Sequence, residues 1–345
     1  MVRKIGFWIL VVFLVIGLSV PCGLAAKKDK VYNMKISLDS TENHHRNKGL
    51  KVFRLLIEKN SKGRINVQYY HSAQLYKDRD IPKAMKLGTV EMAAPGIWIL
   101  EGVDPNMAIT ALPMFYGLPE HISKELIDGE VGDLLTESLE KKMNVKVLGK
   151  WLYHGYMNVC TKTRPILKIE DWNGLKIRHP GGASNAFKLK GFGSSPVMIP
   201  WPDLSMAIIQ GTADGFLTTF KSFESAKLWE TGAVYATKDM TQYLQYIPMV
   251  SNKFWKSLPE DLQKILLDTW EEMVDTERAI SDYEQKKGET VMKKHGVTIY
   301  YPSAEQLAKW REHIMPVQDQ IIEKTGMDKA FVAKVQKIVD EALKK

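Results

Sequence analysis

Apolar and polar residues alternate along two early segments of the chain, and the segments after them keep a helical spacing. Every second residue is apolar from Tyr32 to Leu38 and again within Arg64–Tyr70, which is the pattern of a half-buried strand. We expect helices at 45–60 and 80–87, the second ending at Gly88, because glycine adopts the left-handed conformation that stops a helix. The chain is therefore predicted to begin with two strand–helix pairs.

Short strands between helices continue through the middle of the chain. We expect a connecting loop at 104–118, a helix at 121–142, strands at Val145–Leu148 and Tyr156–Lys162, and a return strand at Gln242–Val250. Short apolar strands that alternate with helices are typical of an α/β protein with a parallel sheet.

The segment Gly174–Thr219 places polar side chains at the ends of predicted strands. One strand ends at Arg178, just before a Pro-Gly-Gly turn, another spans Pro196–Pro200, and a third ends at Thr218. Ligands of open α/β sheets bind outside the carboxyl ends of the strands, and a guanidinium is a rigid donor fork that suits a carboxylate. We expect a small organic anion to bind there; a solvated or ion-paired surface arginine is the alternative.

A short motif occurs twice. Ala84–Met92 resembles Ala207–Gly215, because in both a helix ends, a Gly-Thr pair follows, and an acidic residue opens a strand. The copies lie about 120 residues apart, which favours two lobes built alike.

A long helix is predicted after these two lobes. The segment Ser257–Glu260 is a capping box with proline in the first turn, which is a strong helix start. Apolar residues then keep the helical period up to Gly296, and about 37 residues at 1.5 Å each span roughly 55 Å. We expect this helix to cross both lobes, with two shorter helices as the alternative. Helices at 304–325 and 328–344 are expected to serve packing only.

An ordered set of segments resembles the solute-binding proteins of tripartite (TRAP, DctP-like) transporters over about residues 30–330. The segments are Lys62–Ile65, Ala73–Leu75, Ala84–Met92, Leu112–Phe115, Gly174–Arg178, Met198–Pro200 and Gly211–Gly215. The resemblance implies an α/β, two-lobed fold like that of periplasmic binding proteins, with a long helix spanning both lobes. It also implies that the protein closes on its ligand and delivers it to a membrane permease driven by an ion gradient.

The predicted elements and the resemblance together give a division of the chain. We expect a signal peptide at 1–26, lobe I at 27–155 plus about 240–275, lobe II at 156–239 plus about 276–320, and a C-terminal helix at 321–345 that packs on the lobes. The protein is expected to be a monomer whose partners are a small organic acid and the subunits of a TRAP permease.

Residues 1–26 have the features of an export signal. A basic start precedes the almost wholly apolar run Ile5–Val20, and the small residues that follow are typical of a cleavage site, which we expect near Ala25 or Ala26. An uncleaved anchor is the alternative, although the apolar run is shorter than the roughly 20 residues that a membrane-spanning helix needs. A lipoprotein modified at Cys22 fits the local pattern poorly. We expect a periplasmic protein.

Charge and cysteine content argue against nucleic-acid binding and against an intramolecular disulfide. The formal net charge of +8 falls to +6 without residues 1–26, which hold two basic and no acidic residues. Basic and acidic residues are interleaved as on solvated helix faces, so we expect no binding of nucleic acid. Cys160 is the one cysteine left after cleavage, and it cannot form an intramolecular disulfide.

Motifs of enzymes and of cofactor sites are missing from the sequence. It contains no G-x-S-x-G, H-E-x-x-H, C-x-x-C, P-loop or G-x-G-x-x-G motif. His44 and His45 are adjacent at a helix start, where we expect them to point apart as surface or helix-entry residues rather than form half a metal site. Cys160 is interpreted as a small buried hydrophobe. We predict a binding protein without a catalytic cofactor or a dedicated metal site, not an enzyme; a cation that bridges ligand and protein is the alternative left open.

Arg178 is the main candidate for ligand binding, because in the resembling family an arginine at this position pairs with the ligand carboxylate. Candidate hydrogen-bond partners are Asn158, Thr218 and Thr219. Aromatic residues near the expected pocket are candidate walls: Trp98, Phe115, Tyr116, Trp151, Phe216, Phe220 and Trp201. Since ligand pockets are mostly apolar, we expect a monocarboxylate with an apolar or aromatic body. For any single ring, a place in the core is the alternative.

Two departures from the family pattern bear on the ligand. Many members carry a second arginine where this chain has Met157 or Asn158, and the usual polar residues after the Asp-Gly pair are replaced by Phe216, Leu217 and Thr218. A dicarboxylate or sialic-acid receptor would need a second cation, so these ligands are disfavoured. Two other functions stay open: a receptor that presents its ligand to a membrane signalling protein and, less favoured, a periplasmic enzyme on a bilobal scaffold.

Overall fold

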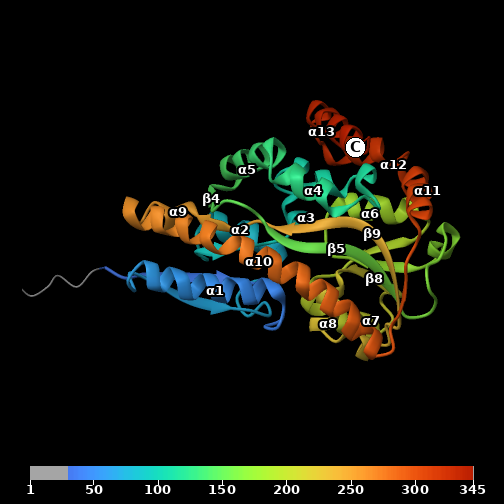
Figure 1. Cartoon of the computed structure of the whole chain (residues 1–345), viewed down its shortest axis with the longest axis horizontal. Coiled ribbons are helices and arrows are strands. Elements are labelled where there is room, and N and C mark those ends of the chain that lie inside the picture. The colour runs from blue at the N-terminus through green and yellow to red at the C-terminus, as the bar shows by residue number, and fades with distance from the viewer. Residues whose placement is uncertain (1–29, 345) are drawn as a thin grey trace, which may run out of the picture. The chain divides into compact units, whose positions relative to one another are not determined.

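The computed structural model describes residues 30–344, so the predicted signal peptide and its cleavage site lie outside the described residues. From Val31 onward the chain forms one compact unit. This unit contains two β-sheets with helices packed around them (Figure 1). Two sheets within one unit confirm the predicted two-lobed α/β fold, whereas the residue boundaries of the lobes stay a prediction.

The first sheet contains the N-terminal strands. Its strands are β1 (Tyr32–Ser37), β2 (Ile65–Tyr70), β3 (Met92–Ala93), β4 (Val145–Val147) and β10 (Met249–Ser251). They lie in the order β2-β1-β3-β10-β4. β1 pairs in parallel with β2 and β3, and β10 runs antiparallel between β3 and β4. The late strand β10 therefore returns the chain to the first sheet, as predicted, but the predicted strand Gln242–Val250 is divided: its residues up to Tyr246 belong to β9 of the other sheet, and Pro248 separates them from β10.

The second sheet contains the longest strands. Its strands are β5 (Leu152–Thr161), β6 (Lys176–His179), β7 (Ser195–Met198), β8 (Gly215–Thr218), β9 (Tyr235–Tyr246) and β11 (Thr298–Tyr300). They lie in the order β11-β9-β5-β8-β6-β7. β6 is parallel to β7 and β8, but β5 is antiparallel to β8 and β9. Both sheets are thus mixed rather than parallel, because β10 in the first sheet and β5 in the second run against the other strands.

Thirteen helices surround the sheets in the described part of the chain. They are α1 (His45–Asn60), α2 (Ile81–Leu87), α3 (Ile97–Leu100), α4 (Glu120–Ile127), α5 (Glu130–Met143), α6 (Ala183–Gly191), α7 (Leu204–Ile209), α8 (Phe220–Ser225), α9 (Asn252–Trp255), α10 (Glu260–Lys294), α11 (Ala304–Ile314), α12 (Val317–Thr325) and α13 (Lys329–Ala342). Short 3-10 helices lie at Asp78–Asp80, Pro105–Ala111, Pro113–Phe115, Ile169–Trp172, Trp201–Asp203 and Leu228–Thr231.

The helix α10 is continuous over 35 residues, which confirms one long helix and rules out two shorter ones. Glu260 and Asp261 lie in its first turn and Lys293 and Lys294 in its last, where these charges complement the helix dipole. α10 packs against α1 beside the first sheet and against β5 and α8 of the second (Figure 1). It therefore spans both lobes, as the sequence predicts.

The contact between α8 and α10 requires glycine. A Cβ at Gly288 would lie 2.9 Å from the carbonyl oxygen of Phe220 and 3.0 Å from the amide nitrogen of Lys221. Only a residue without a side chain lets the two backbones approach so closely. This contact fixes the start of α8, directly after β8.

Two predicted helices are interrupted. The helix predicted at 121–142 is divided into α4 and α5 at Asp128 and Gly129, because glycine has a low helix propensity. The helix predicted at 304–325 is divided into α11 and α12 at Pro316, whose ring and missing N–H interrupt a helix. The predicted loop 104–118 contains two 3-10 helices.

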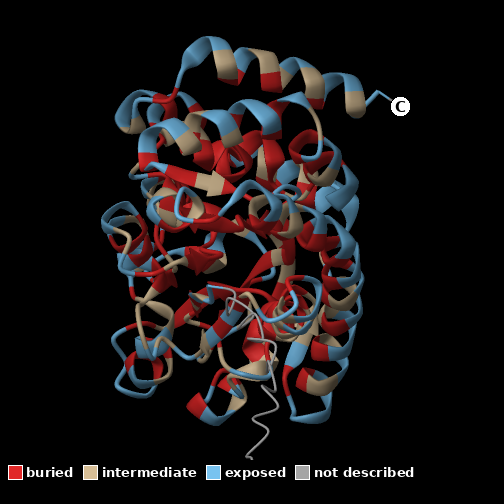
Figure 2. Ribbon diagram, turned by 90° about the vertical axis from the view of Figure 1, so that its left-hand side faces the viewer, coloured by how far each residue is buried: buried red, intermediate tan, exposed pale blue. Residues whose placement is uncertain are grey.

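Buried apolar residues form one large core cluster along the first sheet and β5, and a smaller cluster around α7, α8 and β8. Figure 2 shows buried residues in the interior and exposed residues on the outer helix faces. Cys160 is fully buried in the smaller cluster, as predicted, and burial raises the pKa of its thiol. Among residues 30–344, no helix combines the length and apolar character needed to cross a membrane.

Candidate functional site

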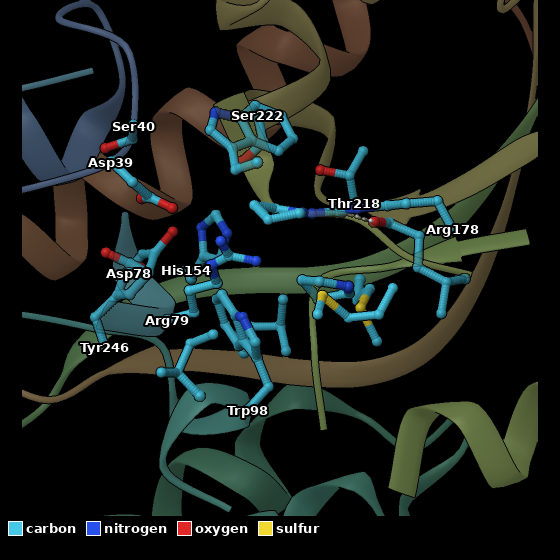
Figure 3. A pocket seen from close by; sticks show the side chains of 18 residues that line it. Asp39, Ser40, Asp78, Arg79, Trp98, His154, Arg178, Thr218, Ser222 and Tyr246 are labelled. Carbon is cyan, nitrogen blue, oxygen red and sulfur yellow. Dashed lines mark hydrogen bonds between the residues drawn. The ribbon is translucent and has the colours of Figure 1, made fainter. Parts of the chain in front are cut away.

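A cavity lies where strands of both sheets end (Figure 3). Asp39 and Ser40 follow β1, Trp98 in α3 follows β3, Arg178 lies in β6, and Thr218 ends β8. The carboxyl ends of parallel strands are where open α/β sheets bind ligands. The lining consists of Asp39, Ser40, Asp78, Arg79, Trp98, Ile99, His154, Met157, Arg178, Pro180, Met198, Pro200, Trp201, Leu217, Thr218, Ser222, Leu244 and Tyr246.

The guanidinium of Arg178 is held rigidly, yet one of its nitrogens has no partner. Nε donates to the carbonyl of Ile199 at 2.8 Å, and Nη1 donates to the carbonyl of Leu217 at 3.1 Å. Nη2 is buried without a hydrogen-bond partner. The side chain is 1% exposed, and burial lowers the pKa of Arg178 to about 9, because the charged form loses its hydration. An anion at Nη2 would supply the missing partner.

Two carboxylates and a buried arginine form the other end of the cavity. Arg46 donates to Asp39, to Asp78 Oδ2 at 3.2 Å and to the carbonyl of Ala94 at 2.8 Å. Its guanidinium carbon lies 3.9 Å from the centre of the Tyr246 ring. When both acids are ionised, the three charged side chains carry a net charge of −1.

Asp78 carries a second unmatched polar atom of the cavity lining. Its Oδ1 is buried without a hydrogen-bond partner, and the residue is 5% exposed. Burial and, next, the charge of Asp39 raise the pKa of Asp78 to about 7, although Arg46 acts in the opposite direction. The cavity therefore combines an unpaired donor on Arg178 with an unpaired acceptor on Asp78.

Aromatic and apolar side chains form the walls between these two ends. The ring of Tyr246 lies 5.6 Å from that of Trp98 and 4.5 Å from that of His154, between ring centres. The ring centre of Trp201 lies 5.9 Å from the guanidinium carbon of Arg178. Burial lowers the pKa of His154 well below its usual value, so this ring is neutral. Charge thus enters the lining at its two ends and not along the aromatic wall.

Four of the predicted ligand-binding residues line the cavity: Arg178, Thr218, Trp98 and Trp201. Met157 lines it as well, so a thioether stands where many family members carry a second arginine. Contact with a ligand stays a prediction for each of these residues.

Three further predicted residues lie outside the lining. Asn158 accepts from the amide of Met240 at 3.2 Å and donates to a carbonyl of its own strand at 3.1 Å. Thr219 caps α8, with its hydroxyl oxygen accepting from the amide of Ser222 at 3.2 Å. Phe220 is buried in the smaller core cluster. Hydrogen bonds within the fold and core packing, rather than the cavity, account for these side chains.

The remaining four predicted aromatic residues are part of the core. Phe115 and Phe216 are buried. Tyr116 donates its hydroxyl to Asp239 Oδ2 at 2.7 Å, and Trp151 donates Nε1 to a threonine hydroxyl at 3.3 Å. These rings take the alternative place in the core, because burying a large ring stabilises the fold wherever its polar atom finds a partner.

His44 and His45 are buried beside His154, so the prediction that they lie apart on the surface is wrong. Their ring centres are 4.2 Å apart, and one nitrogen of each of the three rings lies within 4.8 Å of the others. The two rings share one side because His44 is the extended N-cap residue of α1 (φ −68°, ψ 145°), whereas His45 is already helical. The helix-entry position itself is confirmed.

Hydrogen bonds within the protein account for this histidine cluster. His45 uses Nδ1 toward Glu277 at 2.9 Å and Nε2 toward His154 Nδ1 at 3.2 Å. His44 uses Nε2 toward Ser222 at 3.0 Å, and its Nδ1 accepts from the amide of Arg46 at 3.2 Å. Within the cluster, these bonds to described residues occupy every ring nitrogen except Nε2 of His154. The cluster therefore links Glu277 to the cavity wall, and we assign no metal to it.

Fourteen of the 18 lining residues were not predicted to bind the ligand, among them Asp39, Asp78, His154 and Tyr246. Asp39 follows the first strand directly, which is the same signal that marks Arg178. Asp78 lies in a 3-10 helix well past β2, where no periodicity points to it. His154 and Tyr246 face the cavity from β5 and β9, whose pairing shifts register near His154, and such a bulge cannot be read from alternation.

Comparison with protein families decides where the chain belongs. The sequence model of the DctP family, described as bacterial extracellular solute-binding protein, family 7, matches residues 37–325. The chain belongs to this family. The resemblance drawn from the motifs is thereby confirmed, and so is the prediction that the chain is not an enzyme.

Similar proteins of the DctP family bind different acids. The C4-dicarboxylate-binding periplasmic protein DctP of Rhodobacter capsulatus is 28% identical over 284 residues, which are 81% of this chain and 84% of the relative. A TRAP periplasmic solute-binding protein of Sulfurospirillum deleyianum, solved with bound succinate, matches with a TM-score of 0.83 at 25% identity and covers 90% of this chain and 99% of its own. The sugar acid binding protein DctPAm of Advenella mimigardefordensis, solved with galactonate, matches with a TM-score of 0.85 at 21% identity, over 91% of this chain and 99% of its own. The last comparison supports the fold alone.

Proposed function

We propose that this DctP-family protein is a periplasmic receptor that captures a small monocarboxylate with an apolar or aromatic body and delivers it to a TRAP membrane permease. Arg178 carries the proposal. Two of the five N–H groups of its guanidinium are used by backbone carbonyls, so three remain for a carboxylate, including both N–H groups of the unpartnered Nη2.

The walls support a single carboxylate on an apolar body. Met157, Leu217 and Leu244 line the cavity together with Trp98 and Trp201, and apolar walls stabilise an apolar ligand body through its removal from water. The relative from Rhodobacter capsulatus is named for C4-dicarboxylates, but a second carboxylate would here meet a thioether or the acidic end of the cavity.

One further cation borders the cavity without contradicting this proposal. Arg79 lines the cavity, but its side chain is 51% exposed and lies 3.7 Å from Asp80. A charge so open to solvent interacts weakly with a ligand. Arg178 is therefore the group expected to hold the carboxylate.

Replacing Arg178 by methionine tests the proposal, because methionine keeps much of the length and removes the charge. We expect Arg178→Met to cost roughly 2–5 kcal/mol of binding free energy, which is about 30-fold to several thousand-fold in affinity. Isothermal titration with phenylacetate and with straight-chain acids of four to six carbons measures this loss. Arg54→Met on α1 removes a half-exposed charge that pairs with Glu58 and should leave affinity unchanged.

Two results would contradict the proposal. In the first, Arg178→Met lowers thermal stability and leaves carboxylate affinity alone, which would make Arg178 a structural residue. In the second, alcohols, sugars or amines raise the melting temperature and no carboxylate does. A true ligand at 100 times its dissociation constant adds about 2.7 kcal/mol to the free energy of unfolding, so a panel of thermal shifts separates these outcomes.

A further inference from the structure

Two fully buried side-chain atoms of the cavity lining have no hydrogen-bond partner, and they lie at its opposite ends. Figure 3 shows Arg178 and Thr218 at one end and Asp39, Ser40 and Asp78 at the other, with Trp98 between them. Nη2 of Arg178 is a donor without an acceptor, and Oδ1 of Asp78 is an acceptor without a donor. A buried polar atom without a partner destabilises the protein, because its bond to water is lost and not replaced. A ligand that pairs with both atoms removes this destabilisation at each of them.

Hydrogen bonds within the protein hold the acidic end of the cavity in place. Arg46 holds Asp39 and Asp78 on either side of its guanidinium and also donates to Ser40 Oγ at 3.1 Å. The ring of Tyr246 covers one face of the Arg46 guanidinium. Arg46 therefore binds Asp78 through Oδ2, and Oδ1 of the same carboxylate stays without a partner.

We propose that the ligand carries a hydrogen-bond donor, an ammonium or a hydroxyl group, on the end opposite its carboxylate, and that Asp78 receives this donor beside Asp39. This inference rests on the proposed function, because it assumes that Arg178 holds the carboxylate. It narrows the substrate class to amino acids and hydroxy acids whose polar groups are separated by an apolar body.

Charge favours the donor over a second carboxylate. The groups that face Asp78 are Asp39 and Arg46 from the α1 side, Arg79 from its own segment, and Tyr246 and the neutral His154 from the long strands. Since Arg79 is paired with the exposed Asp80, the charge left at this end is that of Arg46, Asp39 and Asp78, which is −1 when both acids are ionised. An ammonium neutralises this charge, a hydroxyl satisfies Oδ1 without changing it, and a carboxylate adds to it.

A matched series of straight-chain acids tests the inference on the unmodified protein. At four, five and six carbons the far end is varied between methyl, hydroxyl, ammonium and carboxylate, so that only one group changes within a length. We expect the hydroxy or amino acid to bind at least tenfold more tightly than the unsubstituted acid at one length at pH 8. The dicarboxylate of that length should bind no better than the unsubstituted acid. Which donor binds more tightly identifies the amino acid or the hydroxy acid as the substrate class.

The variant Asp78→Asn tests the same point through the protein. The asparagine side chain keeps the shape of the aspartate and loses its charge. We therefore expect the gain in affinity from a terminal ammonium to fall at least tenfold, and the affinity for the dicarboxylate to rise. Asp268→Asn, an exposed acid on α10 that pairs with Lys264, should keep the original ranking. If Asp78→Asn fails to fold, the series on the unmodified protein still decides.

The outcomes separate this inference from the proposed function. If none of the acids binds, or if binding does not depend on Arg178, the proposed function fails and the inference with it. If the acids bind through Arg178 but a terminal donor adds nothing, or if the dicarboxylate binds best at pH 8, the inference alone is overturned.

Discussion

The carboxyl group of Asp78 makes the stability of the protein depend on pH. Burial, followed by the charge of Asp39, raises its pKa from 3.8 to about 7. The folded protein therefore binds this proton more tightly than the unfolded chain does. The stability gained from the protonated group is fully present below about pH 4 and is lost as the pH rises toward 7.

We expect Asp78→Asn to remove this part of the pH dependence. Between pH 5 and pH 8 the original protein should lose free energy of unfolding relative to the variant, by at most about 1.4 kcal/mol per pH unit. Urea denaturation at both pH values measures the difference, and groups common to both proteins cancel. Asp268→Asn should follow the original protein; equal slopes for Asp78→Asn and the original protein would refute the assignment.

Single residues are predictable from sequence where local order places them. Arg178 ends a strand before a Pro-Gly-Gly turn, so its place at the cavity follows from the strand itself. Tyr116 and Phe216 were predicted as pocket walls but are core residues. The sequence alone does not show whether an aromatic side chain lines a pocket or packs in the core. The histidine cluster depends on a bulge in β5 and on Glu277 far along the chain, and neither is visible locally.

At the scale of elements, the backbone contact at Gly288 positions α8 against α10. The first turn of α8 carries Thr219 as its cap and Ser222, which lines the cavity. Since a Cβ at Gly288 would lie 2.9–3.0 Å from backbone atoms of α8, α8 has to move if any side chain is introduced there.

We therefore expect Gly288→Ala to lower the free energy of unfolding by about 1–3 kcal/mol, as overpacking commonly does, although alanine favours a helix over glycine. Carboxylate affinity should fall at the same time, because Ser222 shifts with α8. Thermal denaturation and titration measure the two effects. Gly102→Ala, where a Cβ would meet no atom within 4 Å, is the control; an unchanged stability of Gly288→Ala would argue against the close contact.

Elements with a strong period are predicted well, and their interruptions are not. The bounds of the helix at 45–60 and of the long helix α10 agree closely with the structure, because their apolar spacing is regular. The capping box predicted at Ser257–Glu260 is wrong: Pro259 is the N-cap residue of α10 and no side chain caps the helix, because the Ser257 hydroxyl donates to the carbonyl of Phe254 instead. The breaks at Gly129 and Pro316 are single residues inside continuous apolar patterns. The direction of β5 and β9 follows from tertiary pairing, and therefore the mixed sheets could not be predicted from local order.

At the scale of the whole molecule, two contacts join segments that follow strands of different sheets. Glu101, in the segment after β3 and α3, accepts from the amide of Ser184 at 3.0 Å and from its hydroxyl at 3.1 Å. Ser184 lies in the first turn of α6, between β6 and β7. A second contact joins Lys77 to Asp203 at 2.7 Å on the surface. None of these four residues lines the cavity.

The contacts of Glu101 with Ser184 and of Lys77 with Asp203 could not be predicted from the sequence. The two-lobed plan followed from the repeated Gly-Thr motif and from the resemblance, but which residues meet across the lobes depends on how the lobes close. Glu101 is buried although it is a charged residue, and it faces the N-terminal end of a helix from another part of the chain. No local pattern marks such a pair.

We expect Glu101→Ala to weaken carboxylate binding although Glu101 does not touch the ligand. The carboxylate satisfies Ser184 near the positive end of α6, and a hydrogen bond to a charged group contributes about 1.5–3 kcal/mol. Losing it destabilises the closed form, so affinity should fall about tenfold to a hundredfold, mostly through faster dissociation. Lys77→Ala removes an exposed ion pair worth about 0.2–1 kcal/mol and should cost no more than about fivefold. Stopped-flow release of a bound acid measures both; equal rates for Glu101→Ala and the original protein would mean that closure does not depend on this contact.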